Sequence, residues 1–177
     1  MSQGFHQEAR RIVAMKRLLA GACSLLCCSY LSMAQTSPQE YYQMLENMYR
    51  KTIPLIQPAE VEDHAIILDT REMNEYVVSH IPGSRLVPYE SFRLGALEDL
   101  DKDATIVVYC SVGYRSERIG EKLLAAGFSK VYNLYGGIFN WLYTGGEIVN
   151  MNNEPTLSIH TYNKTWSQWC LTGDKIW

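Results

Sequence analysis

The segment TIVVYCSVGYRS, residues 105–116, provides the starting point for interpreting the rest of this chain. It begins with the β-branched run 105–108, which is typical of a buried strand. Ser116 then offers an N-cap for the apolar helical pattern over residues 117–126. The segment therefore predicts a strand, a tight loop and a helix, with Cys110 directly after the strand.

Cys110 lies where a loop joins a strand end to a helix start. Such a loop directs successive backbone N–H groups inward, and the helix dipole adds positive potential there. A cysteine at its base is held as a thiolate, because the N–H groups solvate the charged form. Alone, a cysteine after a buried strand is more often a small core hydrophobe. With Gly113 in the turn, Arg115 beside it and the N-cap that follows, we interpret Cys110 as a nucleophile in an anion site.

Residues 110–116, CSVGYRS, resemble the active loop of the rhodanese-like sulfurtransferases, whose pattern is C-x-x-G-x-R-S. Two other parts of the chain are similar to the family's first and last signatures: ILDTR at 67–71 with Glu75-Tyr76 and HIPGS at 80–84, and VYNLYGGIFNW at 131–141. The resemblance covers roughly residues 55–145. It implies an α/β fold with a central, mostly parallel five-stranded sheet and helices on both faces.

The resemblance also implies a reaction, sulfur transfer through a persulfide on Cys110. The cysteine would take a sulfane sulfur from thiosulfate or a persulfide donor and pass it to a thiol or cyanide acceptor, in two half-reactions. The residues expected to bind the donor and the persulfide are Ser111, Val112, Gly113, Tyr114, Arg115 and Ser116 of the loop, together with Arg71. No metal and no organic cofactor is implied.

Asp69 and Arg71 follow a short apolar strand, residues 65–68. The carboxyl end of that strand lies at the same edge of a parallel sheet as Cys110, so both side chains are expected near the loop. We interpret Asp69 as one half of a structural ion pair, and the sequence leaves Arg71 open between that pair and a substrate contact. His80 is interpreted as a hydrogen-bonded structural histidine, since no second ligand lies at metal spacing.

Other functions fit part of the same pattern. Phosphatases and arsenate reductases related to this family use a longer loop with five residues between cysteine and arginine; here four residues separate Cys110 from Arg115, and the smaller ring suits a single sulfur atom. A non-catalytic binding module typically loses the cysteine, whereas a persulfide carrier would keep it. A thiol redox enzyme would pair Cys110 with Cys170, which otherwise fills an apolar position.

Residues 1–34 predict an export signal peptide. Lys16-Arg17 precede a short apolar run, and Ser32-Met-Ala34 supplies small residues before Gln35. We therefore expect a periplasmic or secreted protein without stable membrane insertion, because the apolar run is too short for a comfortable span. The alternative is a lipid anchor at Cys23, which follows Ala20-Gly-Ala.

The composition limits the partners. The net charge is −3 over the whole chain, and without residues 1–34 the chain keeps 12 of its 16 basic and 18 of its 19 acidic residues, a net charge of −6. No basic patch remains for nucleic acid. Of the five cysteines only Cys110 and Cys170 lie outside the leader, too few for a disulfide framework or a zinc site. The expected partners are a small anionic sulfur donor and a thiol acceptor, and the oligomeric state stays open.

The predicted organisation has four parts: the export signal, 1–34; an N-terminal helix, 35–54; a rhodanese-like domain, 55–145; and a Trp-rich extension packed on that domain, 146–177. Apolar periodicity predicts helices over 39–50, 72–78, 89–100, 117–126 and 138–143, and strands over 65–68, 84–87, 105–108 and 131–134. Residues 157–162 alternate in polarity, which indicates an extra edge strand.

Overall fold

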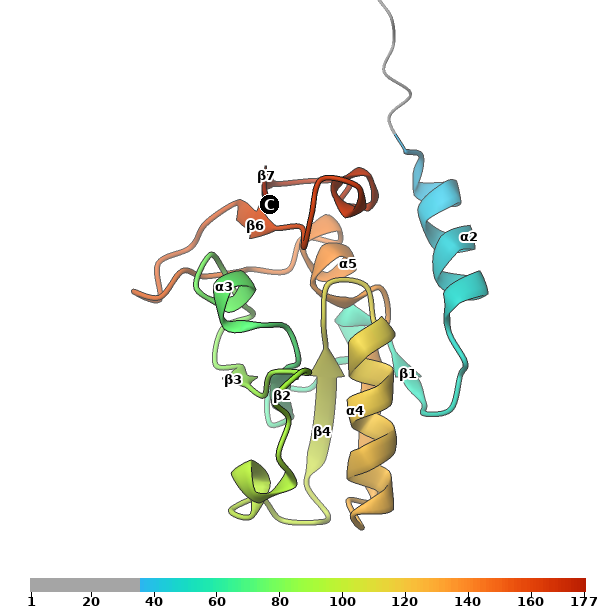
Figure 1. Ribbon diagram of the computed structural model, residues 1–177, viewed down its shortest axis with the longest axis vertical. Helices are drawn as coiled ribbons and strands as arrows, with labels where there is room; N and C mark the ends of the chain where they lie inside the picture. The colour runs from blue at the N-terminus through green and yellow to red at the C-terminus, as the bar shows by residue number, and fades with distance from the viewer. Residues whose placement is uncertain (1–35) are drawn as a thin grey trace, which may run out of the picture. The chain divides into compact units, whose positions relative to one another are not determined.

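The computed structural model describes residues 36–177. Its centre is a five-stranded sheet in the order β1-β5-β4-β2-β3, and every neighbouring pair is parallel (Figure 1). The strands are β1 Leu55–Ile56, β2 Ile66–Asp69, β3 Arg85–Leu86, β4 Thr105–Tyr109 and β5 Lys130–Leu134. The predicted α/β fold with a parallel five-stranded sheet is confirmed.

Helices cover both faces of this sheet, as predicted. They are α2 Pro38–Met48, α3 Met73–Tyr76, α4 Tyr114–Ala125 and α5 Gly137–Tyr143, with 3₁₀ turns η1 Pro58–Glu60, η2 Leu94–Leu97 and η3 Trp166–Trp169. Successive side chains of a strand point to opposite faces. Along β4, Ile106 and Val108 therefore pack with Ile119 of α4, whereas Val107 and Tyr109 belong to a separate buried cluster.

The second cluster joins three segments that are distant in sequence. It contains residues of α2, of α5 and of the C-terminal segment, represented by Leu45, Phe139 and Ile159, all at most 1% exposed. A capping box formed by Ser37 and Glu40 fixes the start of α2. The segments that precede and follow the central sheet in sequence therefore pack together with α5 in one buried cluster.

The C-terminal segment, residues 146–177, has a small sheet of its own. Strands β6 Ser158–His160 and β7 Asp174–Ile176 pair in parallel with each other. Strand β6 lies within the range 157–162 predicted for an extra strand, but it pairs with β7 and is not part of the five-stranded sheet. In Figure 1 this segment lies beyond the arrowhead of β4, at the carboxyl edge of the main sheet.

Two other predictions need correction, and one strand was not predicted. The helix expected over 89–100 is reduced to η2, because Leu94 is 42% exposed and does not share a buried face with Leu97. Helix α4 begins at Tyr114, so its N-cap is Gly113 and not Ser116. Strand β1 was missed because it is two residues long and lies between prolines.

The predicted export signal, 1–34, lies outside the described residues. Within residues 36–177, no helix has both the length and the apolarity needed to cross a membrane.

Candidate active site

Cys110 lies immediately after β4, at the edge of the sheet where the parallel strands end. Its side chain is 1% exposed, and its Sγ accepts a hydrogen bond from the backbone N–H of Gly113 at 3.2 Å. Gly113 has a φ of 103°, a conformation that favours glycine, and a Cβ there would collide with the ring of Tyr49. The chain therefore turns tightly around the sulfur before α4 begins.

The environment of the thiol favours its ionised form. Burial of Cys110 opposes ionisation, but the positive charge of Arg115 and three backbone N–H groups outweigh it and lower the pKa of the thiol below its ordinary value. Those N–H groups belong to Val112, Gly113 and Ser116. The loop thus has the properties of a cradle for a sulfur anion.

Arg115 is held in place by Glu75, a partner that sequence reasoning missed. Its two terminal nitrogens donate to the two carboxylate oxygens of Glu75 at 2.6 and 2.8 Å. The Ser111 hydroxyl also donates to Glu75, at 3.2 Å. Burial opposes the ionisation of Glu75, but the pairing with Arg115 keeps its pKa below the ordinary value, so this is a charged pair. Arg115 is therefore oriented, and its charge is partly compensated, before any substrate arrives.

Tyrosines from the N-terminal helix and the residue after it support the loop from behind. The Tyr49 hydroxyl donates to the carbonyl of Val112 at 2.6 Å and accepts from the N–H of Gly136 at 2.8 Å. The Tyr41 hydroxyl donates to the carbonyl of Gly136, also at 2.8 Å. Both rings are almost fully buried. The loop carrying Cys110 and the turn before α5 are thus joined through a side chain from outside the central sheet.

Ser116 contributes to the same support. It is fully buried in the first turn of α4, and its hydroxyl donates to Asn133 Oδ1 at 2.7 Å. The amide of Asn133 in turn donates to the carbonyl of Gly113 at 3.0 Å. Ser116 therefore fixes α4 against β5 instead of capping the helix.

A pocket of about 290 Å³ opens above Cys110. Cys110 lines this pocket together with Ser111, Val112, Tyr114 and Arg115 of the loop. The structure therefore brings five of the predicted site residues together around one pocket. The rest of the lining comes from two other segments: Tyr89 and Glu90 after β3, and Tyr162 and Trp166 of the C-terminal segment. The predicted loop residues thus form the floor, and residues that the sequence analysis did not identify form much of the rim.

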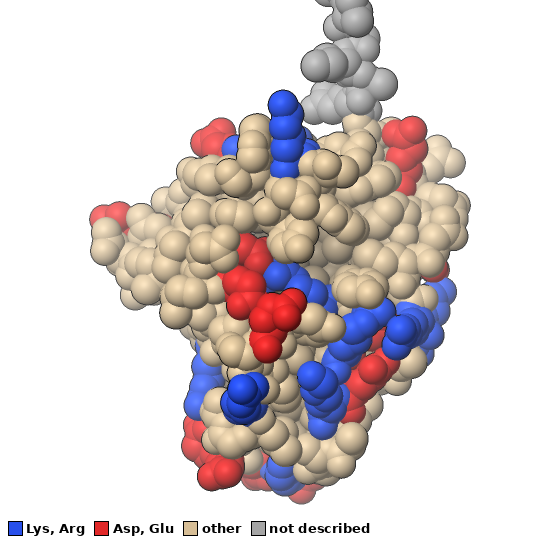
Figure 2. Space-filling view, viewed as in Figure 1, with Lys and Arg blue, Asp and Glu red and all other residues tan. Residues whose placement is uncertain are grey.

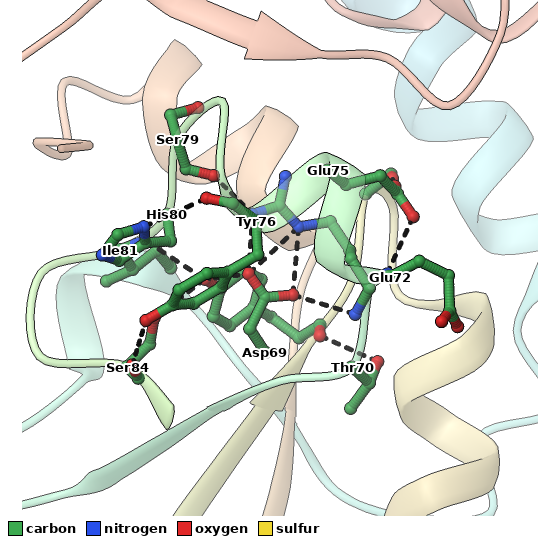
Figure 3. A network of polar contacts seen from close by, with 12 residues as sticks. Asp69, Thr70, Glu72, Glu75, Tyr76, Ser79, His80, Ile81 and Ser84 are labelled. Carbon is green, nitrogen blue, oxygen red and sulfur yellow. Dashed lines mark hydrogen bonds and ion pairs between the residues drawn. The ribbon is translucent and has the colours of Figure 1, made fainter. Parts of the chain in front are cut away.

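Asp69 lies in the buried polar network drawn in Figure 3, and Arg71 is bound to it. Both side chains are fully buried, and Arg71 donates to Asp69 at 2.6 Å and to the carbonyl of Ser79 at 2.7 Å. The Tyr109 hydroxyl donates to Asp69 at 2.6 Å. Arg71 does not line the pocket, so the structure places it in the ion pair and not at the substrate position predicted for it.

His80 also lies in this network, away from the pocket lining. Its ring stacks on that of Tyr76 at 3.9 Å between centroids, and its Nδ1 lies 3.2 Å from the carbonyl oxygen of Tyr76. Its backbone exchanges two hydrogen bonds with Val149, which attaches the C-terminal segment. Among residues 36–177, no group of three or more His, Cys, Asp or Glu side chains is arranged to hold a metal ion.

Cys170 is fully buried, and its thiol donates to the carbonyl of Thr172 at 3.1 Å. Burial raises the pKa of this thiol to about 11. A thiol that is buried and protonated is a poor nucleophile, so this environment disfavours the redox pairing of Cys110 with Cys170.

Sequence reasoning missed six residues of the site and its support: Glu75, Tyr49, Tyr89, Glu90, Tyr162 and Trp166. Glu75 carried a signal, because it lies in a segment similar to a family signature and an arginine in an anion site needs an acidic partner when buried. The four aromatic residues carried none, since an isolated Tyr or Trp in sequence is more often a core or surface residue.

The segment that carries this site is similar to known proteins. Residues 55–144 match the profile of the family described as Rhodanese-like domain. Over 83 residues the chain is 35% identical to the thiosulfate sulfurtransferase GlpE of Pseudomonas fluorescens, a match that covers 47% of this chain and 75% of that protein. The solved rhodanese-like domain of the Alr3790 protein from Anabaena is 27% identical, with a TM-score of 0.52, over 56% of this chain and 80% of that domain.

Other relatives are longer proteins with different names. The chain is 36% identical over 85 residues to a tRNA uridine(34) hydroxylase of Hamiltonella defensa, covering 45% of this chain and 24% of that protein. It is 37% identical over 76 residues to the probable adenylyltransferase/sulfurtransferase MoeZ of Mycobacterium tuberculosis, covering 42% of this chain and 19% of that protein. The match thus spans a quarter or less of these two proteins, and what is shared is the domain.

Proposed function

This chain belongs to the rhodanese-like family, and from that premise we propose that it is a sulfurtransferase that carries sulfane sulfur as a persulfide on Cys110. One observation carries the proposal: the Cys110 sulfur accepts the N–H of Gly113 at the base of the loop, and Arg115 with the loop N–H groups lowers its pKa. A thiolate is the form that attacks a sulfane sulfur. The cradle that lowers the pKa also favours the anionic terminal sulfur of the product.

The proposed reaction has two half-reactions. The Cys110 thiolate attacks the outer sulfur of the donor, so that a new S–S bond forms and the donor's own bond to that sulfur breaks; with thiosulfate the leaving group is sulfite, which takes the bonding electron pair. A thiol or cyanide acceptor then attacks the terminal sulfur and restores the thiolate. Arg115 would orient an anionic donor at the mouth of the pocket. The Ser111 hydroxyl, which donates to Glu75 and accepts from Arg115, would hold these two side chains in their orientation.

The test is thiosulfate:cyanide sulfur transfer by the purified chain beside a Cys110→Ser variant, with circular dichroism to confirm that both are folded. Activity in the first and none in the second supports the proposal. If neither protein turns over, mass spectrometry of the donor-treated chain decides between two alternatives. One added sulfur atom on Cys110 would favour a persulfide carrier, and no adduct would favour a non-catalytic binding module.

We also propose that residues 1–34 direct export, so that the mature protein begins at Gln35 in the periplasm or outside the cell. The support is the order of a basic pair, a short apolar run and small residues before Gln35. Intact-mass measurement of the protein from fractionated cells tests this. An unprocessed chain in the cytosol would refute export, and a lipid-modified Cys23 would support the anchored alternative.

A further inference from the structure

The rim of the pocket above Cys110 is aromatic. Tyr89, Tyr114, Tyr162 and Trp166 all line it, and they come from three separate segments of the chain. Two of them, Tyr162 and Trp166, lie beyond residues 55–144, the segment that matches the family profile. The C-terminal segment therefore adds two rings to a pocket whose floor is made by the family loop.

Tyr162 is held in position at some conformational cost. Its φ is 66°, in the left-handed region that few residues other than glycine, asparagine and aspartate adopt. Its backbone N–H donates to His160 Nδ1 at 3.1 Å, and its ring lies 5.3 Å from the guanidinium carbon of Arg115. The side chain nevertheless remains 55% exposed. Strained, exposed aromatic residues are typical of binding sites rather than of cores.

Negative groups outnumber positive ones around the pocket. Among the described residues, Arg115 is the only Lys or Arg that lines it, and both its terminal nitrogens are bound to the Glu75 carboxylate. A second carboxylate, Glu90, also lines the pocket, and Cys110 reacts as an anion. In Figure 2 the surface over the C-terminal segment is mainly uncharged, whereas charged side chains gather over α4. A doubly charged donor such as thiosulfate would therefore gain little net attraction.

Two further cations pack on the outside of the rim rings. The Arg118 guanidinium carbon lies 3.4 Å from the ring centroid of Tyr114, and Lys122 Nζ lies 5.9 Å from that of Tyr89. Neither residue lines the pocket. They support the rings from outside the space that a donor would occupy.

We propose that the sulfur donor is an organic compound with an apolar or aromatic group beside its sulfane sulfur, and that Tyr162 and Trp166 select it. This inference rests on the proposed sulfurtransferase function and names its substrate class. A cavity of roughly 150 Å³ accommodates a benzene molecule, and the pocket here measures about 290 Å³. A ring therefore fits between the rim aromatics while the sulfur reaches Cys110.

Organic thiosulfonates, R–SO₂–S⁻, provide matched probes of this idea. The Cys110 thiolate attacks the outer sulfur, the S–S bond of the donor breaks, and the sulfinate R–SO₂⁻ leaves with the bonding pair. Cyanide then removes the terminal sulfur as thiocyanate and restores the thiolate, so charge and atoms balance. Benzenethiosulfonate and methanethiosulfonate are both monoanions and differ in the group that would contact the rim.

The test compares kcat/KM for the two donors in the full chain, each divided by the rate constant for the uncatalysed reaction of that donor with cyanide. Aromatic contacts predict a preference of about tenfold or more for benzenethiosulfonate. Tyr162→Asn, which removes the ring and tolerates a positive φ, should reduce the preference to about threefold or less, and Trp166→Ala should reduce it similarly. Trp177→Ala, outside the pocket and 59% exposed, is the matched control and should leave it unchanged.

The outcomes separate the two proposals. Turnover of both donors without a preference, or a preference that Tyr162→Asn leaves intact, would overturn the selection of an organic donor and leave the sulfurtransferase function standing. The absence of turnover and of any persulfide with thiosulfate and both thiosulfonates would refute the sulfurtransferase function itself.

Discussion

Tyr49→Phe should loosen the active loop from a position outside the central sheet. The substitution removes one oxygen atom and keeps the ring, so packing in the core is preserved. That oxygen donates to the carbonyl of Val112 and accepts from the N–H of Gly136, and it is buried. Both backbone groups lose their tyrosine partner at once, and Val112 lies two residues from Cys110.

The magnitude follows from the number of hydrogen bonds that the hydroxyl makes. A buried polar group left without its partner costs about 1–3 kcal/mol. With two groups affected and some relaxation, Tyr49→Phe should lower the free energy of unfolding by about 2–4 kcal/mol. Tyr41→Phe loses one buried bond, to the carbonyl of Gly136, and should cost about half as much. Tyr42→Phe loses a bond to Asn140 that is only partly buried and should cost less than about 1 kcal/mol.

Urea unfolding at equilibrium measures this series, and sulfur transfer at saturating donor measures its effect on the reaction. We expect Tyr49→Phe to lower kcat by about tenfold, since a small displacement of the loop N–H groups weakens the cradle. Tyr42→Phe serves as the control and should retain full activity. If Tyr49→Phe is no less stable than Tyr42→Phe and turns over normally, the reasoning that α2 and its flank hold the active loop is refuted.

Three other predictions concern the loop and the second cysteine. The thiolate is the reacting form and the pKa of Cys110 is lowered, so the rate of persulfide formation should fall as the pH drops through a midpoint below the ordinary thiol pKa of about 8.5. Arg115→Met should move the midpoint of this pH–rate profile upward, because it removes the positive charge beside the thiol. Gly113→Ala should abolish activity and destabilise the fold, since the φ of Gly113 is 103° and the new Cβ would collide with Tyr49. Gly83→Ala is the control: Gly83 has a φ of 72° but open space around it, so the free energy of unfolding measured in urea should fall by only about 1–2 kcal/mol and activity should remain. Cys170→Ser should leave turnover unchanged and reduce stability by about 1–3 kcal/mol, whereas loss of turnover in a folded variant would identify Cys170 as a resolving thiol.

The fold was predictable from the sequence because its strongest signals are local. The β-branched run before Cys110, the glycine in the turn and the apolar helix after it specify strand, loop and helix within one segment. Where local signals were weak or ambiguous, the prediction failed. Strand β1 is defined only by its pairing with β5, and the apolar residues near 89–100 do not share one buried face.

The site was less predictable than the fold, since its remaining parts are brought together by tertiary contacts. Glu75 and Arg115 are 40 positions apart and meet only because β2 and β4 are neighbours in the sheet. Ser116 illustrates the opposite case. Its residue type and position suggested a cap, but the positive φ of Gly113 starts the helix three residues earlier and leaves the serine free to bond Asn133. Local propensity therefore drew attention to Ser116, but its hydrogen-bond partner, Asn133, is determined by the packing of α4 against β5.

The residues outside the family match explain how a common loop can acquire a particular specificity. The loop itself supplies a nucleophile and an anion cradle, and those properties depend on Cys110, Gly113 and Arg115. Tyr49 lies before the matched segment and acts on the loop from behind, where it can alter the position of the cradle without itself lining the pocket. Tyr162 lies after it and acts from the front, where it shapes the pocket and leaves the thiol's hydrogen bond untouched. Substitutions on the two sides should therefore separate in kinetics: those at Tyr49 should change kcat alike for every donor, and those at Tyr162 should change kcat/KM for one donor relative to another.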